Sequence, residues 1–285
     1  MPHSLTKKSF HDGFGLHTPM VNGELKCIRY YPYFDMGFAL MKKLLTAPGG
    51  VYFIARGEHK MSLSENKKQV IRCASSLDDV YEIIGEDFWV VCPCMSSINN
   101  EALLEGTRLT LCKKISDVGE VGVGYDFSIR TPGLPSRWAA MDSELTACFN
   151  AIVKQLVLLK RMEMMDVATP NSETLKRVAE AQVLRESLRL FYYWVNFAPL
   201  TRGSAMCGYA AVLAVIIASN KTITSLIPPG KQLDWEAIFT STPSEFIKKF
   251  EKEIHTKPSD FSLSDIDFET AMPSLYDVLQ TLHLA

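Results

Sequence analysis

An uncharged run of 18 residues, from Gly203 to Asn220, constrains this chain more than any other feature. Its length is near the lower limit for a helix that crosses a membrane, but it contains two glycines, two serines and an asparagine. Small side chains favour close packing between helices, and they recur at positions 203–205, 208, 210, 211 and 214. The run therefore predicts a buried central helix over about 203–219 rather than a membrane span.

The composition is that of an ordinary soluble globular protein, with 47% apolar residues, 22% charged residues and a formal charge of -2. It favours neither a nucleic-acid partner nor a membrane partner. Seven scattered cysteines indicate reduced thiols, and hence a cytoplasmic location with the nucleus as the alternative. Cys92 and Cys94 have no second pair to complete a metal site, so we expect no metal and no cofactor.

Short β-branched and aromatic runs lie between turn residues over about 87–131, in DFWVVCPC, TRLTLCKKI and YDFSIRT. This pattern predicts two or three antiparallel strands. The segment 51–55 is a further candidate strand. Residues 36–45 and 62–84 have helical spacing, which in the second segment is interrupted near a serine pair.

The rest of the chain has helical patterns. Asp142 or Ser143 is a candidate cap for one long helix, and Asn171 or Ser172 for a second that ends near Phe197. Shorter helices are predicted after Leu233, Pro243 and Pro273, the last of them following a polar link.

These elements predict an α+β fold that is predominantly helical. A small antiparallel β element (about 87–131) packs on a helical bundle that contains the buried central helix (about 203–219). We expect a single domain over 1–285, with a mixed α/β and loop part over 1–140 and a helical part over 141–285.

Several long motifs occur in order along the chain: HDGFGLHTP, RYYPYFD, DFWVVCPCMS, LEGTRLTL, FSIRTPGLPSRW, FYYWVNFAPLTRGSAMCGY, LDWEAIFTSTPSEF and MPSLYDVLQTL. Together they resemble the conserved C-terminal region of the tetratricopeptide repeat protein 13 family, which includes plant suppressors of resistance-receptor immunity. The resemblance implies a regulatory or scaffold role with a protein partner. The chain shows no tetratricopeptide repeats of its own, so functions that belong to those repeats are not expected here.

Arginine recurs within these motifs. A guanidinium is always charged and is costly to bury without an acceptor, so each arginine needs a partner. One hypothesis is that several of them line a pocket for an anionic group. The alternative is that they tie strands and helices together through nearby carboxylates. The arginines concerned are Arg108, Arg130, Arg137 and Arg202, and the carboxylates are Glu105, Asp126, Asp142 and Glu144.

Arg202 stands directly before the predicted start of the uncharged helix, after Thr201 and before Gly203 and Ser204. The first four N–H groups of a helix have no internal partner, and the helix dipole places positive charge there. Glycine lets a ligand approach the backbone, serine can donate a hydrogen bond, and arginine adds a full charge. These residues predict a cradle for a nucleotide or another anionic small molecule. The alternative is an ordinary turn with a serine cap.

A helix, a polar loop and a second helix also resemble the corresponding element of Fic-type nucleotidyl transferases, whose loop binds phosphate. Those enzymes need a histidine base before the loop and an acidic residue within it. This chain has no histidine between His59 and His255, so whether it is an enzyme stays open. The two hypotheses are a regulatory or scaffold domain that binds another protein, and an enzyme or degenerate enzyme of Fic-like type.

Overall fold

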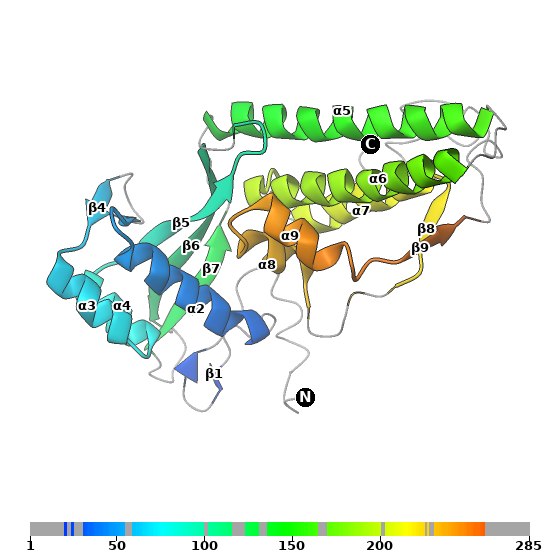
Figure 1. Ribbon diagram of the computed structural model, residues 1–285. Coiled ribbons are helices and arrows are strands. Elements are labelled where there is room, and N and C mark those ends of the chain that lie inside the picture. Colours follow the sequence, from blue (N-terminus) through cyan, green and yellow to red (C-terminus); the bar gives the residue numbers. More distant parts are fainter. Residues whose placement is uncertain are drawn as a thin grey trace, which may run out of the picture.

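The computed structural model shows a sheet with short helices at one end and long helices at the other (Figure 1). The architecture is α+β and predominantly helical, as predicted. The structure describes residues 20–21, 24–25, 31–54, 59–99, 102–115, 123–130, 136–164, 170–200, 203–225, 227 and 231–259.

The main sheet has five antiparallel strands in the order β4-β3-β5-β6-β7. It is larger than the predicted element over 87–131, because the candidate strand near residue 51 pairs with β5 and brings a further strand with it. The strands are β3 (Val51–Ile54), β4 (Lys60–Ser62), β5 (Phe88–Met95), β6 (Leu103–Ile115) and β7 (Val123–Arg130). Two separate antiparallel strand pairs join β1 (Met20–Val21) to β2 (Glu24–Leu25) and β8 (Lys221–Ile223) to β9 (Thr256–Pro258).

Alternate residues of β5 and β6 form a buried face of the sheet. Phe88 and Val90 pair with Leu111 and Leu109, and all four side chains are almost fully buried. Two helices pack on these strands, α2 (Tyr31–Thr46) on β5 and α4 (Leu77–Ile84) on β6. The helix α3 (Glu65–Cys73) ends just before the predicted break, and Ser76 then caps α4 in a capping box.

Three long helices form the other end of the molecule: α5 (Ser136–Met164), α6 (Pro170–Phe197) and α7 (Ser204–Ala218). The middle helix is α6, which packs against both α5 and α7. The predicted cap of α5 at Asp142 or Ser143 was wrong, because both residues lie inside the helix. A capping preference is a local effect, and the burial of Arg137 and Glu144 at this end of α5 outweighs it.

Two short helices, α8 (Leu233–Ile238) and α9 (Pro243–Phe250), pack against α6. Both begin where the sequence predicts. Phe246 of α9 stacks on Phe191 of α6 with ring centroids 6.2 Å apart. One cluster of buried apolar side chains includes these two rings and Leu111 of the sheet, so the core is continuous between the two ends of the molecule. The predicted helix after Pro273 lies outside the described residues.

The helix α7 has nearly the predicted bounds, but the prediction that it is buried was wrong. Among its 15 residues only Gly208, Val212 and Ile216 are buried, and all three face α6. The lack of charged residues in α7 permits burial of the helix. Burial also depends on how many elements surround the helix, and its own sequence does not show that number. In the described part of the chain, α7 packs mainly on α6 and leaves its other side open.

The contact between α6 and α7 depends on Gly208. A Cβ atom at this position would lie 2.7 Å from Cδ1 of Trp194, closer than real carbon atoms approach. Trp194 has little freedom to move away, because its indole N–H donates a 2.7 Å hydrogen bond to the carbonyl of Ser204.

We therefore predict that Gly208→Ala lowers the free energy of unfolding by about 1–3 kcal/mol, although alanine is the better helix former. Cys207→Ala is the matched control, because Cys207 is exposed on the same turn; it should change stability by less than about 0.5 kcal/mol. Urea unfolding of both variants measures the difference. Equal stability of the two would show that α6 and α7 are not in close contact.

Candidate functional site

Arg137, in the first turn of α5, joins three elements that carry the sequence motifs. Its guanidinium donates to the backbone carbonyls of Glu105 and Gly106 in β6, with N–O distances of 3.0 and 3.1 Å. It also donates to the carbonyls of Asn196 and Phe197 at the end of α6, at 3.2 and 3.3 Å. The planar fork of an arginine is suited to such a set of acceptors. Arg137 thus fixes α5, α6 and β6 to one another.

The positive charge of Arg137 lies at the C-terminal end of α6, where the helix dipole stabilises it. The last carbonyls of a helix carry partial negative charge, and Asn196 and Phe197 end α6. Arg137 is only 3% exposed, and this burial lowers its pKa to about 10. The charge of Glu105 opposes this shift and that of Arg108 adds to it. The guanidinium is therefore still protonated at neutral pH, and its buried charge is balanced by backbone dipoles.

Asn196 and Gly106 complete this centre. Asn196 is fully buried, and its amide Nδ2 donates to the carbonyls of Tyr192 and, in α8, Ala237. Gly106 allows the close approach of β5 and β6, because a Cβ there would lie 2.6 Å from the carbonyl oxygen of Cys92. Neither residue was among the predicted site residues. Their presence inside the motifs LEGTRLTL and FYYWVNFAPL was the signal that could have found them.

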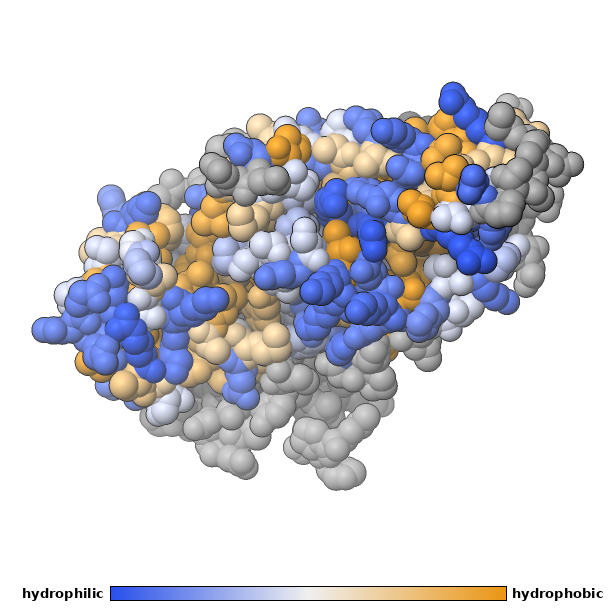
Figure 2. Space-filling view, in the orientation of Figure 1, coloured by the Kyte–Doolittle hydropathy of each residue, from blue (hydrophilic) through white to orange (hydrophobic). Residues whose placement is uncertain are grey.

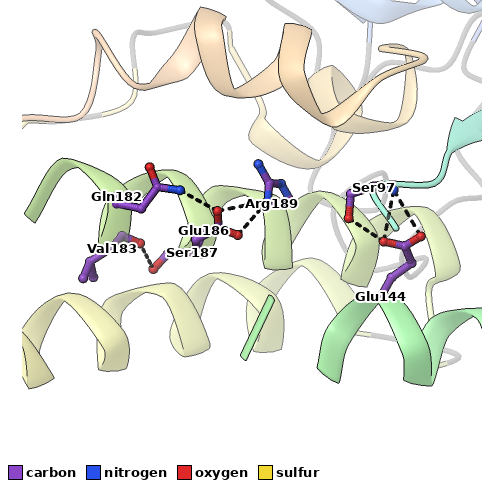
Figure 3. A network of polar contacts seen from close by, with 7 residues as sticks. All are labelled: Ser97, Glu144, Gln182, Val183, Glu186, Ser187 and Arg189. Atoms are coloured by element: carbon purple, nitrogen blue, oxygen red, sulfur yellow. Dashed lines mark hydrogen bonds and ion pairs between the residues drawn. The ribbon is translucent and has the colours of Figure 1, made fainter. Parts of the chain in front are cut away.

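A second polar contact attaches the β5–β6 connection to α5 (Figure 3). The buried carboxylate of Glu144 accepts hydrogen bonds from the hydroxyls of Ser96 and Ser97, the latter at 2.6 Å. It also accepts from the backbone N–H of Ser97 at 3.1 Å. Glu144 was a candidate partner for an arginine, but the partners that the structure gives it are serines. These bonds satisfy a buried charge without a cation.

A third contact lies within α6, also in Figure 3. Glu186 is 3% exposed and receives hydrogen bonds from Gln182 at 2.7 Å and from Arg189 at 2.8 and 2.9 Å. The spacing of three and four residues brings these side chains together on one side of the helix. None of these three residues was a predicted site residue.

The cysteines near these contacts are not activated as nucleophiles. Burial raises the pKa of the Cys92, Cys94 and Cys148 thiols to about 12, so all three are neutral at physiological pH. In the described ranges, no group of three His, Cys, Asp or Glu side chains is placed to hold a metal ion.

Two of the predicted anion ligands lie on neighbouring strands. Arg108 of β6 and Arg130 of β7 are partners across the antiparallel pair. The guanidinium carbon of Arg108 stands 3.5 Å from the ring centroid of Trp89, and Trp89 stacks on Phe53 at 3.9 Å. The aromatic ring thus provides a cation–π partner for Arg108. Arg137, a third predicted anion ligand, donates its hydrogen bonds to the carbonyls described above.

The predicted cradle at the start of α7 is described only in part, because Thr201 and Arg202 lie outside the described residues. Gly203 has a left-handed backbone with φ of 78°, and no side chain within the described residues caps the helix. The Ser204 hydroxyl accepts from the Leu200 N–H at 3.1 Å and donates to the Leu200 carbonyl at 3.0 Å. Ser204 therefore closes the turn instead of capping α7.

We predict that Arg137→Lys lowers the free energy of unfolding by about 2–4 kcal/mol, because an ammonium cannot reach carbonyls on two sides at once. Arg177→Lys is the matched control: Arg177 is exposed and pairs with Glu173 on the surface of α6. It should change stability by less than about 0.5 kcal/mol. Chemical denaturation compares the two variants, and a Arg137→Lys protein as stable as the wild type would contradict the role of the fork.

None of the helices in the described part of the chain is both long and apolar enough to cross a membrane. No family model matches the chain, and no solved structure matches it.

Two curated proteins are similar to most of the chain. It is 36% identical over 241 residues to Suppressor of RPS4-RLD 1 of Arabidopsis thaliana, and this match covers 84% of the chain. It is 25% identical over 258 residues to Tetratricopeptide repeat protein 13 of Homo sapiens, with 86% of the chain covered. The chain spans 21% and 26% of the lengths of these two relatives. Over most of its length, the chain is therefore homologous to part of these two proteins, in agreement with the resemblance to the tetratricopeptide repeat protein 13 family that its motifs indicate.

Proposed function

We propose that the chain is a regulatory or scaffold domain that binds another protein through α5. The observation that carries this proposal is an apolar stripe on the outer side of that helix. Phe149, Val153 and Val157 are spaced by four residues, so they lie along one side, and they are 57%, 39% and 44% exposed. A soluble helix rarely presents such a stripe to water unless something binds there.

The surroundings of the stripe fit a partner protein. Figure 2 shows hydrophobic surface toward the outer end of α5 and α6, among hydrophilic side chains. Further exposed apolar residues at that end are Leu158 and Met164 of α5 and Leu175 and Val178 of α6. Apolar residues at this spacing suit a partner helix that lies along α5. A regulatory role is also supported by relatedness to a protein named as a suppressor.

The contacts of the inner side explain why the stripe is free to bind. Glu144, Cys148, Ile152 and Leu159 are buried on the opposite side of α5. They hold the helix to α6 and to the β5–β6 connection, so the outer side is not needed for packing within the described residues. A partner could therefore use it without rearranging the domain.

We predict that Phe149→Glu abolishes the binding of at least one partner protein without changing the fold. Loss of a buried phenylalanine costs about 2 kcal/mol or more, which is about a 30-fold weaker Kd. Asn150→Glu is the matched control, because Asn150 is the exposed polar neighbour on the same helix and receives the same charge. Quantitative affinity capture from cell extract with wild type, Phe149→Glu and Asn150→Glu should give a protein that only Phe149→Glu loses. If the three folded proteins capture the same set, α5 is not the binding surface.

A second proposal is the anion cradle at Arg202, Gly203 and Ser204. It is supported by the left-handed Gly203 at the start of α7, together with the absence of a side-chain cap in the described residues. Free N–H groups at the start of a 15-residue helix attract a phosphate. Transfer chemistry of the Fic type is not carried forward, because the segment from Val195 to Ser204 supplies neither the histidine nor the acidic residue that it needs.

For the cradle, we predict that a nucleotide or phosphorylated metabolite raises the unfolding temperature, since a ligand at about 100 times its Kd stabilises a protein by about 2.7 kcal/mol. Arg202→Ala should abolish the shift and keep the fold. Arg161→Ala, which removes an exposed arginine from α5, should leave the shift unchanged. A panel of such compounds that shifts neither wild type nor control, or an Arg202→Ala protein that does not fold, would reject the cradle.

A further inference from the structure

A small cavity lies where the start of α2, the strand β7 and the helix α8 meet (Figure 1). Its described lining includes Tyr33 and Phe34 of α2, Phe127 and Ser128 of β7, and Trp235 of α8. These residues belong to three of the long sequence motifs, RYYPYFD, FSIRTPGLPSRW and LDWEAIFTSTPSEF. The space measures about 280 Å³ including its open mouth, which is small for a drug-sized ligand. It therefore suits a single small group.

Aromatic rings dominate the lining of this cavity. Tyr33 and Trp235 are stacked, with ring centroids 6.1 Å apart. Phe34 meets Phe127 edge to face at 5.7 Å. The face of an aromatic ring carries partial negative charge and attracts a cation that lies against it. Rings gathered from several elements around one small space are the arrangement that recognises a methylated ammonium group.

The ring of Tyr33 is fixed by two hydrogen bonds. Its hydroxyl donates to Oε1 of Glu236 at 3.1 Å and accepts from the backbone N–H of Gln232 at 2.7 Å. Burial raises the pKa of Tyr33 to about 12, so the hydroxyl stays neutral at physiological pH. A ring that is already held in place loses little conformational freedom when a ligand enters, which favours binding.

The charges around the cavity are compatible with a cation. The carboxylates of Asp234 and Glu236 are close enough to Tyr33 to raise its pKa further. Lys249 forms an ion pair with Glu236 and offsets one of these negative charges. The described lining itself contains no lysine, arginine or histidine. A positive group in the cavity would therefore meet no like charge among the described residues that line it.

The polar groups of the lining favour a quaternary ammonium over a lysine ammonium. An unmethylated ammonium has three N–H donors, and each needs an acceptor when the group leaves water. The side-chain oxygens in the described lining are the hydroxyls of Tyr33 and Ser128, and that of Tyr33 already accepts from Gln232. A quaternary ammonium has no N–H group, so it can lie among the rings without an unsatisfied donor.

We propose that this aromatic cavity binds a quaternary ammonium group, which lies in contact with its four rings. The positive charge supplies the attraction to the rings, and the methyl groups fill the apolar space. The same group occurs in free choline and in a trimethylated lysine of a protein. Binding here is independent of the stripe on α5.

Choline and its neutral isostere 3,3-dimethyl-1-butanol separate the effect of charge from that of shape. In the full chain labelled with fluorotryptophan, choline should shift the fluorine NMR signal of Trp235 and leave those of Trp89, Trp138 and Trp194 unchanged. The Kd for choline from this titration should be at least tenfold lower than the Kd for the isostere. A Trp235 signal that does not shift, or equal affinity for the two compounds, would overturn the proposal.

Substitution of one ring tests the position of the site. Trp235→Leu keeps an apolar side chain but removes the ring, and it should weaken choline binding at least fivefold in isothermal titration calorimetry. Phe149→Leu is the matched control, because it removes an exposed ring from α5, and it should bind choline like the wild type. Wild-type affinity in a folded Trp235→Leu protein would overturn the proposal. If that variant does not fold, the comparison of choline with its isostere in the wild type still decides.

A short peptide with one trimethyl-lysine distinguishes the two sources of the group, with the unmethylated peptide as its control. Tighter binding of the methylated peptide than of choline would support a protein ligand, and tighter binding of choline would support a small molecule. Either result requires the Trp235 signal to shift. If neither choline nor the methylated peptide shifts that signal, the proposal is overturned.

Discussion

The fold depends on a single buried guanidinium. Arg137 places a positive charge where β6, the start of α5 and the end of α6 meet, and it donates to four backbone carbonyls there. Backbone acceptors make the arrangement sensitive to backbone geometry. This explains why a glycine at 106 and a fully buried asparagine at 196 stand beside it. The long sequence motifs therefore coincide with a structural junction.

The junction leaves the far ends of the helices with few neighbours. One side of α5 is held through Glu144 and Cys148, and one side of α7 through Gly208. The opposite sides of both helices carry apolar residues without a described neighbour. The two surfaces differ in kind: the α5 stripe has large side chains that fit a foreign helix, whereas the exposed side of α7 carries several alanines. This division places the buried polar contacts at the junction and the proposed binding surface on an outer helix side.

Much of the fold could be predicted from local sequence, and the exceptions have physical causes. Turn residues and periodicity gave the strands near residue 87, the break at the serine pair and the starts of α8 and α9. The start of α5 was missed because the burial of Arg137 and Glu144 extends the helix beyond its local capping signal. The prediction that α7 is buried was wrong because it relied on the lack of charged residues. That composition does not reveal how many elements surround a helix. The four carbonyls that hold Arg137 come from residues far apart in sequence, and no pattern of side chains reveals a backbone acceptor. Glu144, one of the carboxylates expected to pair with an arginine, accepts hydrogen bonds from serines instead.

We infer that Arg137 makes β6 and the end of α6 one cooperative unit. Native-state hydrogen exchange under increasing urea tests it most directly, because it measures the opening free energy of individual amides. We expect amides near Thr107 in β6 and near Asn196 in α6 to open with the same free energy, close to that of global unfolding, and Arg137→Lys to lower both together. If the end of α6 opened at much lower urea than β6 in the wild type, the junction would not be the unit on which the fold depends.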